Sequence, residues 1–354
     1  MLDLEKRLGI APSGSLWVIM PISRLLVETQ ISIGDCSILP PDAADWRSTP
    51  LANQLRDVEV GIRQGILSGR DLREFSTVLT GFSLEILHTH PVVAFTAAID
   101  WNSLLLADHS ADIALLKTLT ATVERALDVV RFDFCRLDLP DTLPGTAGSW
   151  SGSDAWLGAL LFSSETKVGY LIAGAAVEST AVVKGIGLGL DSDPRTPLLR
   201  AADGEVAAVA IHGLSLLSEA MSASSETAKF TRMMTLLEFL ASPYQFSSWK
   251  KVKGEISCHC ARTTSEYHRL AERFRELTSS ENADGSQGGL RTLVVHHGRL
   301  LHELVPKPED RLALFREIQG YASSVLRAMI DHAEETWEQF QAYRAVRKSR
   351  LGVA

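Results

Sequence analysis

The apolar residues of this chain follow a strand-like pattern in its first half and a helical pattern in its second. Short apolar runs rich in β-branched residues, typical of half-buried or buried strands, fill much of the first half. They lie at residues 25–39, 92–100, 156–162 and 168–177. Between them, residues 111–132 carry apolar side chains at helical spacing along a single stripe. The first half therefore predicts a mixed α/β domain, which we place at residues 1–192.

Two prolines, Pro194 and Pro197, interrupt the apolar pattern and mark a domain boundary. Beyond it, every readable segment has helical spacing, and helices are expected at residues 225–241, 249–277 and 290–305. A last helix of about thirty residues follows Pro308. It is expected to end in basic residues, which the helix dipole favours there: Arg344, Arg347, Lys348 and Arg350. Residues 196–354 thus predict an all-α bundle of four or five helices, and the chain as a whole predicts an α+β protein.

The composition narrows the class of protein. With 354 residues, 45% hydrophobic and 22% charged, the chain is long enough for two globular domains. Four cysteines are too few for a disulfide framework, so we expect free thiols and a reducing compartment. No apolar run reaches the roughly twenty residues of a membrane-spanning helix, and the N-terminus lacks the features of a secretory signal. These features predict a cytoplasmic protein that has no membrane partner.

The net charge of −8 argues against a protein that coats DNA, because such binding needs a large basic face. The acidic excess lies before residue 201, since residues 201–354 hold 19 Lys and Arg against 19 Asp and Glu. The second half should therefore repel a nucleic acid less than the acidic first half does.

Three short motifs suggest chemistry but lack the required spacing. The glycine run at 185–189 lacks a third glycine at the spacing of a dinucleotide loop and has no capped helix directly behind it, so a turn or strand is expected there. A single residue separates Cys258 from Cys260. On a helix this spacing points their thiols about 200° apart, which does not enclose a zinc ion. The histidines at 88 and 90 stand before Pro91 with no further histidine near them, so a strand entry or turn is expected there. We therefore expect neither a metal nor a cofactor.

The segment GGLRTLVVHHGRLLHEL, residues 288–304, combines an apolar pattern with basic side chains. Its apolar residues predict a core-facing helix: Leu290, Leu293, Val294, Leu300, Leu301 and Leu304. On that interpretation Arg291 and His296 are solvated residues of a bundle helix. They are also the residue types that bind a phosphate and transfer a proton near neutral pH.

The run from Arg291 to Gly298 resembles the Arg-x(4–6)-His motif of the HEPN superfamily, the higher eukaryote and prokaryote nucleotide-binding domains. Upstream, KFTRMMTLLEFLA (229–241) resembles the Apea-like branch, whose apolar helix carries a glutamate before a turn, here Glu238. The resemblance covers about residues 196–345. In two respects the sequence departs from the family. Thr292 occupies a position that is often Asn, Asp, His or Ser, and the doubled histidine offers His297 beside His296, although the spacing and flanking residues favour His296.

The resemblance implies a metal-independent endoribonuclease that acts as a homodimer, in a bacterial toxin or anti-phage defence system with an antitoxin or a phage-derived trigger. His296 would transfer the proton of the RNA 2′-hydroxyl and Arg291 would bind the phosphate, with Thr292 and His297 as positioning residues. Glu238 would either orient Arg291 or His296 from the facing helix, or only cap polar contacts inside the bundle. Side chains five residues apart on a helix point about 140° apart, so the site is expected to combine two chains.

Two alternatives remain open. One is a non-catalytic HEPN module that dimerises and senses a nucleotide, a nucleic acid or a phage component, with the N-terminal domain as its sensor or binding part. The other is a helical bundle with a purely structural role.

Overall fold

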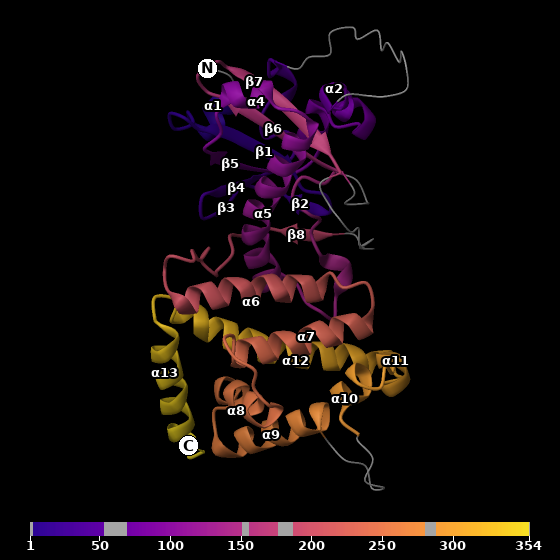
Figure 1. Ribbon diagram of the computed structural model, residues 1–354, viewed down its shortest axis with the longest axis vertical. Coiled ribbons are helices and arrows are strands. Elements are labelled where there is room, and N and C mark those ends of the chain that lie inside the picture. The colour runs from indigo at the N-terminus through magenta and orange to yellow at the C-terminus, as the bar shows by residue number, and fades with distance from the viewer. Residues whose placement is uncertain (1–2, 53–68, 151–155, 176–186, 280–287, 354) are drawn as a thin grey trace. The chain divides into compact units, whose positions relative to one another are not determined.

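The computed structural model describes residues 3–52, 69–150, 156–175, 187–279 and 288–353 (Figure 1). The chain is α+β, as predicted, and divides into two compact units. The first comprises residues 1–127 and 141–197, and the second comprises residues 128–140 and 198–354. The division near residue 197 lies at the proline-containing boundary, whereas the assignment of 128–140 to the second unit has no counterpart in the sequence pattern.

A six-stranded antiparallel sheet forms the centre of the first unit, in the order β3-β4-β5-β1-β6-β7. Its strands are β1 (Leu16–Pro21), β3 (Ile31–Ile33), β4 (Cys36–Leu39), β5 (Val92–Ala97), β6 (Leu157–Ser163) and β7 (Val168–Gly174). Two short strands, β2 (Leu25–Val27) and β8 (Leu188–Leu190), pair with each other in parallel. All four segments predicted to hold strands do so, although residues 176 and 177 of the last segment lie outside the described residues.

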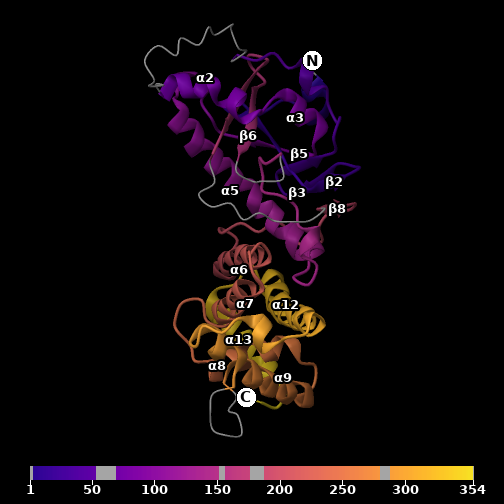
Figure 2. The ribbon, with the colours of Figure 1, turned by 90° about the vertical axis from the view of Figure 1, so that its right-hand side faces the viewer.

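Helices cover both faces of this sheet (Figure 2). The helices that begin in the first unit are α1 (Asp3–Leu8), α2 (Gly69–Thr80), α3 (Leu84–Thr89), α4 (Trp101–Leu106) and α5 (His109–Phe134). Successive strand residues point to opposite faces, so Ile19 packs with Leu87 of α3, while Tyr170 lies against Arg73 of α2 on the other face. Every residue of β6 is buried, which explains why its sequence is continuously apolar. Helix α5 confirms the helix predicted at 111–132.

The glycine run at 185–189 contributes to a turn and a strand. Gly187 has a φ of +98°, and a Cβ on it would lie 2.2 Å from the backbone carbonyl oxygen of Arg24. Only glycine tolerates this conformation and this approach, and the chain continues directly into β8. The prediction is confirmed for residues 187–189, while 185 and 186 lie outside the described residues.

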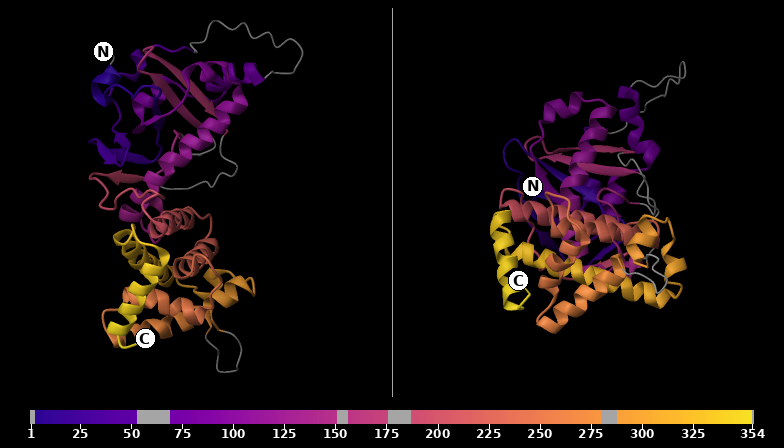
Figure 3. Two further views of the ribbon diagram at one scale, coloured as in Figure 1. Left: turned by 60° about the vertical axis from the view of Figure 1, so that its left-hand side comes forward. Right: turned by 60° about the horizontal axis from the view of Figure 1, so that its bottom comes forward.

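The described part of the second unit is all-α (Figure 3). Its helices are α6 (Glu205–Met221), α7 (Glu226–Ala241), α8 (Trp249–Cys260), α9 (Thr264–Thr278), α10 (Leu290–Val295), α11 (Leu301–Leu304), α12 (Pro308–Asp331) and α13 (Trp337–Arg350). Helix α7 confirms the prediction for 225–241. The other three predicted helices are wrong in extent, since each is divided into two, and the described helices exceed the four or five expected.

Two of these divisions occur where a threonine caps a new helix. The Thr263 hydroxyl accepts a hydrogen bond from the Glu266 N–H at 3.2 Å, which starts α9. The Thr336 hydroxyl accepts one from the Gln339 N–H at 3.3 Å, and the Gln339 side chain accepts one from the Thr336 N–H at 2.8 Å. This reciprocal pair is a capping box, which satisfies N–H groups that would otherwise lack partners. The chain therefore restarts helix α13 at a new angle instead of continuing α12.

Helix α12 packs against α6, α7 and α8 and forms the centre of the second unit. Gly213 of α6 permits this packing, because a Cβ there would lie 2.8 Å from Leu326 Cδ2 and 2.9 Å from Leu240 Cδ2. Arg344, expected among the basic residues that end the last helix, is instead fully buried. Its guanidinium donates to the carbonyl oxygens of Leu240 and Ala241 at 2.8 and 3.0 Å and so caps the carboxyl end of α7.

Candidate functional site

Arg291, the second residue of α10, reaches toward α7 and α8. Its Nη2 lies 2.7 Å from Glu238 Oε1, and its guanidinium carbon lies 5.6 Å from the centre of the Trp249 ring. Trp249 Nε1 donates a hydrogen bond of 2.5 Å to the same Glu238 oxygen. Arg291, Glu238 and Trp249, which we call the Arg291 cluster, thus join three helices through one carboxylate oxygen. The structure brings Arg291 and Glu238 together.

Local sequence explains how the carboxylate and the indole reach this place. Glu238 follows the buried residues Leu236 and Leu237 near the end of α7, at the edge of the apolar face that packs in the core. Trp249 is the first residue of α8, and its ring stacks on the buried Phe274 of α9 with centroids 6.3 Å apart. The cation therefore rests on an aromatic base and beside a carboxylate that the core holds in position.

The Arg291 cluster is only partly buried. The Arg291 side chain is 20% exposed and that of Glu238 is 30% exposed. A pair in this position is more strongly coupled than a surface ion pair but is still reached by water and by small anions. The contact with Glu238 runs through Nη2, and a guanidinium carries five N–H donors, so the same group can bind a second anion.

Thr292 holds α10 in place on α9. Its hydroxyl donates a hydrogen bond to the carbonyl oxygen of Thr278 at 2.8 Å, at the end of α9. A Cβ on Gly289 would lie 2.4 Å from the Thr278 carbonyl carbon and oxygen, so the backbone of α10 approaches α9 too closely for any other residue. Thr292 therefore positions the helix that carries Arg291, whereas the resemblance implied that it would orient a site partner directly.

His296 and His297 lie beyond the last residue of α10 and are both exposed. The helix ends because Gly298 adopts a φ of +66° and the chain reverses, so that the Arg299 N–H donates to the Leu293 carbonyl at 3.1 Å. In the described chain, the side chains of Arg291 and His296 do not interact with each other. His296 keeps right-handed helical backbone angles, so the two side chains still leave the chain about 140° apart.

The apolar face predicted for residues 288–304 is only partly buried. Of that face, Val294 and Leu301 are buried but Leu300 is 45% exposed. Val295, which lies outside the predicted face, is 41% exposed. A continuous core-facing helix through this segment was therefore a wrong prediction. The two histidines lie in a turn flanked by exposed apolar side chains.

Sequence reasoning missed Trp249, which contacts both charged residues of the cluster. It also missed the neighbouring network in which Arg273 binds Glu317 through Nε and Nη2, at 2.9 and 3.0 Å, and Tyr321 donates to the same carboxylate. Burial raises the pKa of Glu317, but the hydrogen bonds from Arg273 and Tyr321 outweigh it and leave the pKa below its usual value. The Arg291 cluster and the Arg273 network each join residues that are far apart in sequence, so no local sequence pattern predicts them.

No group of three or more His, Cys, Asp or Glu side chains in the described chain is arranged to hold a metal ion. In the Cys258-His259-Cys260 segment, burial and then the Arg344 charge lower the pKa of His259 to about 2. Its neutral Nε2 accepts a hydrogen bond from Arg344 Nε at 3.0 Å. This histidine is therefore a structural acceptor for a buried arginine. None of the described helices is both long and apolar enough to span a membrane.

Comparison of the chain with protein-family models, with curated proteins and with solved structures finds no match. The HEPN resemblance rests on the residues of the motif and therefore stays a prediction.

Proposed function

We propose that the second unit is a metal-independent endoribonuclease that acts as a homodimer, in which Arg291 binds the scissile phosphate and His296 transfers the proton. The Arg291 cluster is the observation that carries this proposal. It holds a partly exposed cation in one place, between a carboxylate and an indole, five residues before an exposed histidine.

RNA supplies its own nucleophile, so the chemistry needs few protein groups. The imidazole of His296 accepts the proton of the 2′-hydroxyl as that oxygen bonds to phosphorus. The bond from phosphorus to the 5′-oxygen then breaks, which yields a 2′,3′-cyclic phosphate and a 5′-hydroxyl once the leaving oxygen is protonated. The guanidinium of Arg291 stabilises the charge that develops on the non-bridging oxygens.

Glu238 and Trp249 would make Arg291 effective by preorganisation. A guanidinium already fixed by an ion pair and an aromatic face loses less conformational freedom when a phosphate binds. Because the Arg291 and His296 side chains of one chain diverge, the active pair would come from two copies related by a two-fold axis. On the resemblance, we assign this enzyme to a cytoplasmic toxin or anti-phage system, restrained by an antitoxin or released by a phage-derived trigger.

The test is cleavage of single-stranded RNA by the purified protein in EDTA. The wild type should cleave and leave 2′,3′-cyclic phosphate ends, and Arg291→Ala and His296→Ala should each lose at least about a hundredfold in rate. His268→Ala, which removes an exposed histidine of α9, is the matched control and should keep full activity. Equal cleavage by the wild type and His296→Ala, or cleavage by neither, would sink the proposal.

A non-catalytic HEPN module is the second candidate, and one observation favours it. The charge of Arg291 is already matched by Glu238, as in an ion pair that only joins helices. Expression in a bacterial host separates the two: a ribonuclease arrests growth and loses that effect with Arg291→Ala, whereas a sensing module does neither. In both readings the first unit is the candidate sensor or binding part.

A further inference from the structure

An exposed basic segment precedes and begins α8, directly beside the Arg291 cluster. Residues 239–254 contain no Asp or Glu, yet they contain Lys250, Lys251 and Lys253. All three lysines lie in the first five residues of α8, whose first turn has no acidic residue. Cations at the amino end of a helix are repelled by its dipole, so these lysines do not serve the stability of α8. A polyanion that binds here would be attracted both by the lysines and by the positive end of the helix dipole.

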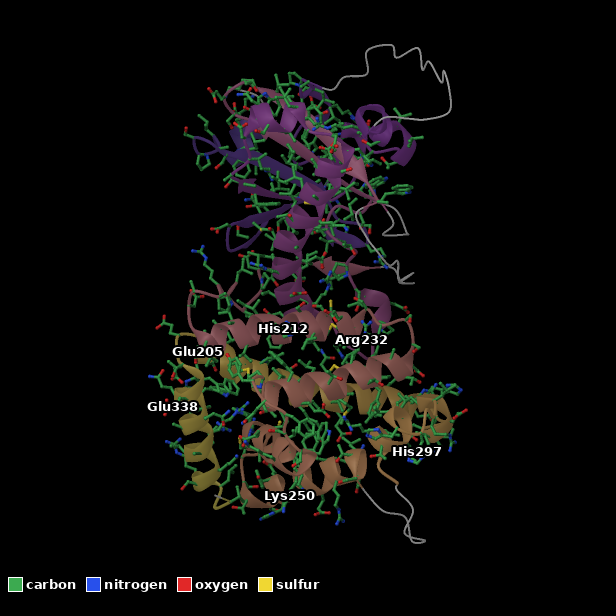
Figure 4. All side chains as sticks on the ribbon, viewed as in Figure 1. Glu205, His212, Arg232, Lys250, His297 and Glu338 are labelled. Atoms are coloured by element: carbon green, nitrogen blue, oxygen red, sulfur yellow. The ribbon has the colours of Figure 1, made fainter. Side chains whose placement is uncertain are left out.

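The three lysines are not used inside the second unit. In the described chain none of them forms an ion pair, and the flanking carboxylates are engaged elsewhere, Glu238 with Arg291 and Glu255 with Lys348 at 2.8 Å. Lys250 and Lys251 are exposed and Lys253 is half-buried. Figure 4 labels Lys250 at the lower edge of the second unit. Their charges therefore face solvent.

Phe246 adds an aromatic face to the same surface. Its side chain is 95% exposed, more than any other large hydrophobic residue in the described chain. It precedes Trp249 by three residues, so their backbones lie at most roughly 11 Å apart. An aromatic ring left open to water beside a row of cations is the combination that binds single-stranded nucleic acid, because bases stack on the ring while cations follow the phosphates.

Helix geometry places two of the lysines, Lys250 and Lys253, on the same side of α8 as the Arg291 cluster. At 100° per residue, Trp249, Lys253 and Lys250 fall within a sector of about 100° around α8. Since the Trp249 ring contacts Arg291, the two lysines extend from the same side of the helix. A strand whose phosphate is bound by Arg291 could therefore continue along α8.

We propose that Phe246, Lys250 and Lys253, the α8 surface, bind the single-stranded RNA that flanks the phosphate held by Arg291. The lysines contact neighbouring phosphates and Phe246 stacks on an unpaired base. The assignment of the substrate rests on the proposed ribonuclease function, but binding at this surface can be measured without cleavage.

The experiment measures binding of a labelled, unstructured RNA of about 20 nucleotides by fluorescence anisotropy, with His296→Ala as the parent so that the RNA stays intact. Lys250→Glu with Lys253→Glu should weaken binding at least tenfold. It should also lower the salt dependence of log K by about 1.4, since each contact to a single strand contributes roughly 0.7. Phe246→Ala should weaken binding about five- to a hundredfold without changing that salt dependence.

The matched control is Lys307→Glu with Arg350→Glu, which makes the same charge change at two exposed positions of the second unit. It should bind RNA within about twofold of the parent, apart from the general effect of net charge at low salt. Equal thermal unfolding of all variants confirms that they fold. Unchanged RNA binding in the Lys250/Lys253 variant, equal losses in the control, or no RNA binding by the parent would each overturn the proposal. If the charge-reversal variant lost affinity for vesicles of anionic lipid but not for RNA, that result would overturn the proposal too.

Cleavage assays separate this inference from the proposed function. In the wild-type background, the Lys250/Lys253 variant should cleave a dinucleotide normally, because that substrate is too short to reach the α8 surface, but should show a raised KM for long RNA. If no variant cleaves anything and RNA binding still depends on Lys250 and Lys253, the ribonuclease proposal fails and the α8 surface stands.

Discussion

Glu238→Gln tests how strongly the Arg291 cluster is coupled. The substitution removes the carboxylate charge but keeps an oxygen that accepts the hydrogen bond from Trp249. Exposed ion pairs contribute about 0.2–1 kcal/mol, and removing one partner of a buried pair costs about 3–5 kcal/mol. The side chains here are 20% and 30% exposed, which lies between these limits. We therefore expect a coupling free energy of about 1–2 kcal/mol between Glu238 and Arg291.

A double-mutant cycle measures this coupling. Glu238→Gln, Arg291→Met and the double variant are unfolded in urea, and the coupling is the difference between the double change in free energy and the sum of the single changes. The control cycle uses Glu303 and Arg299, an i,i+4 pair with side chains 42% and 52% exposed, for which about 0.3–0.5 kcal/mol is expected. In 1 M salt the control coupling should vanish, while most of the Glu238 coupling persists. A Glu238–Arg291 coupling no larger than the control would refute the view that the core holds Arg291 in place.

Two further predictions concern stability. Because burial lowers the pKa of His259 from its ordinary 6.5 to about 2, the unfolded chain binds a proton that the folded chain does not. The free energy of unfolding should fall by up to about 1.4 kcal/mol per pH unit below pH 6.5. Urea titrations at pH 7 and 5.5 should show a smaller fall in His259→Gln than in the wild type. An equal fall in that variant would contradict the lowered pKa of His259. Thr336→Ala removes the capping box with Gln339 and should cost about 1 kcal/mol, or about 2–4 °C in the Tm measured by calorimetry. A Tm within error of the wild type would show that α13 does not depend on this cap.

Strands β2 to β7 and two of the long helices were predictable because their signals are local. The apolar, β-branched runs of β5, β6 and β7 need only a covered sheet to become strands, and the stripes of α5 and α7 each have one period throughout. The division of the later helices was also signalled locally, by Thr263 three residues before Glu266 and by Thr336 three residues before Gln339. An apolar stripe that continues across the cap hides such a signal, since Ala333 and Phe340 keep the helical spacing.

The docking of residues 128–140 in the second unit could not be predicted in this way. Gln319 of α12 accepts a hydrogen bond from the Leu137 N–H at 2.7 Å and donates one to the Cys135 carbonyl at 3.0 Å. Arg316 binds the Asp138 carboxylate at 2.9 Å. These contacts join residues about 180 positions apart in the chain, and nothing in either segment alone indicates the partner. The Trp249 contact with Arg291 belongs to the same class.

The end of α10 changes the basis for choosing between His296 and His297. On a continuous helix the choice would follow from spacing and from the flanking apolar residues, which favour His296. Gly298 instead ends the helix and leaves both imidazoles in an exposed turn beside Val295 and Leu300, two exposed apolar residues. If two copies of the chain meet through these apolar residues, the histidine that enters the shared cleft is set by the turn and by the partner. His296→Ala and His297→Ala must therefore be compared separately. We expect His296→Ala to be the inactive one, because the His296 N–H donates to the Thr292 carbonyl at 2.9 Å and its backbone keeps helical angles, whereas the His297 N–H reaches the same oxygen only at 3.3 Å.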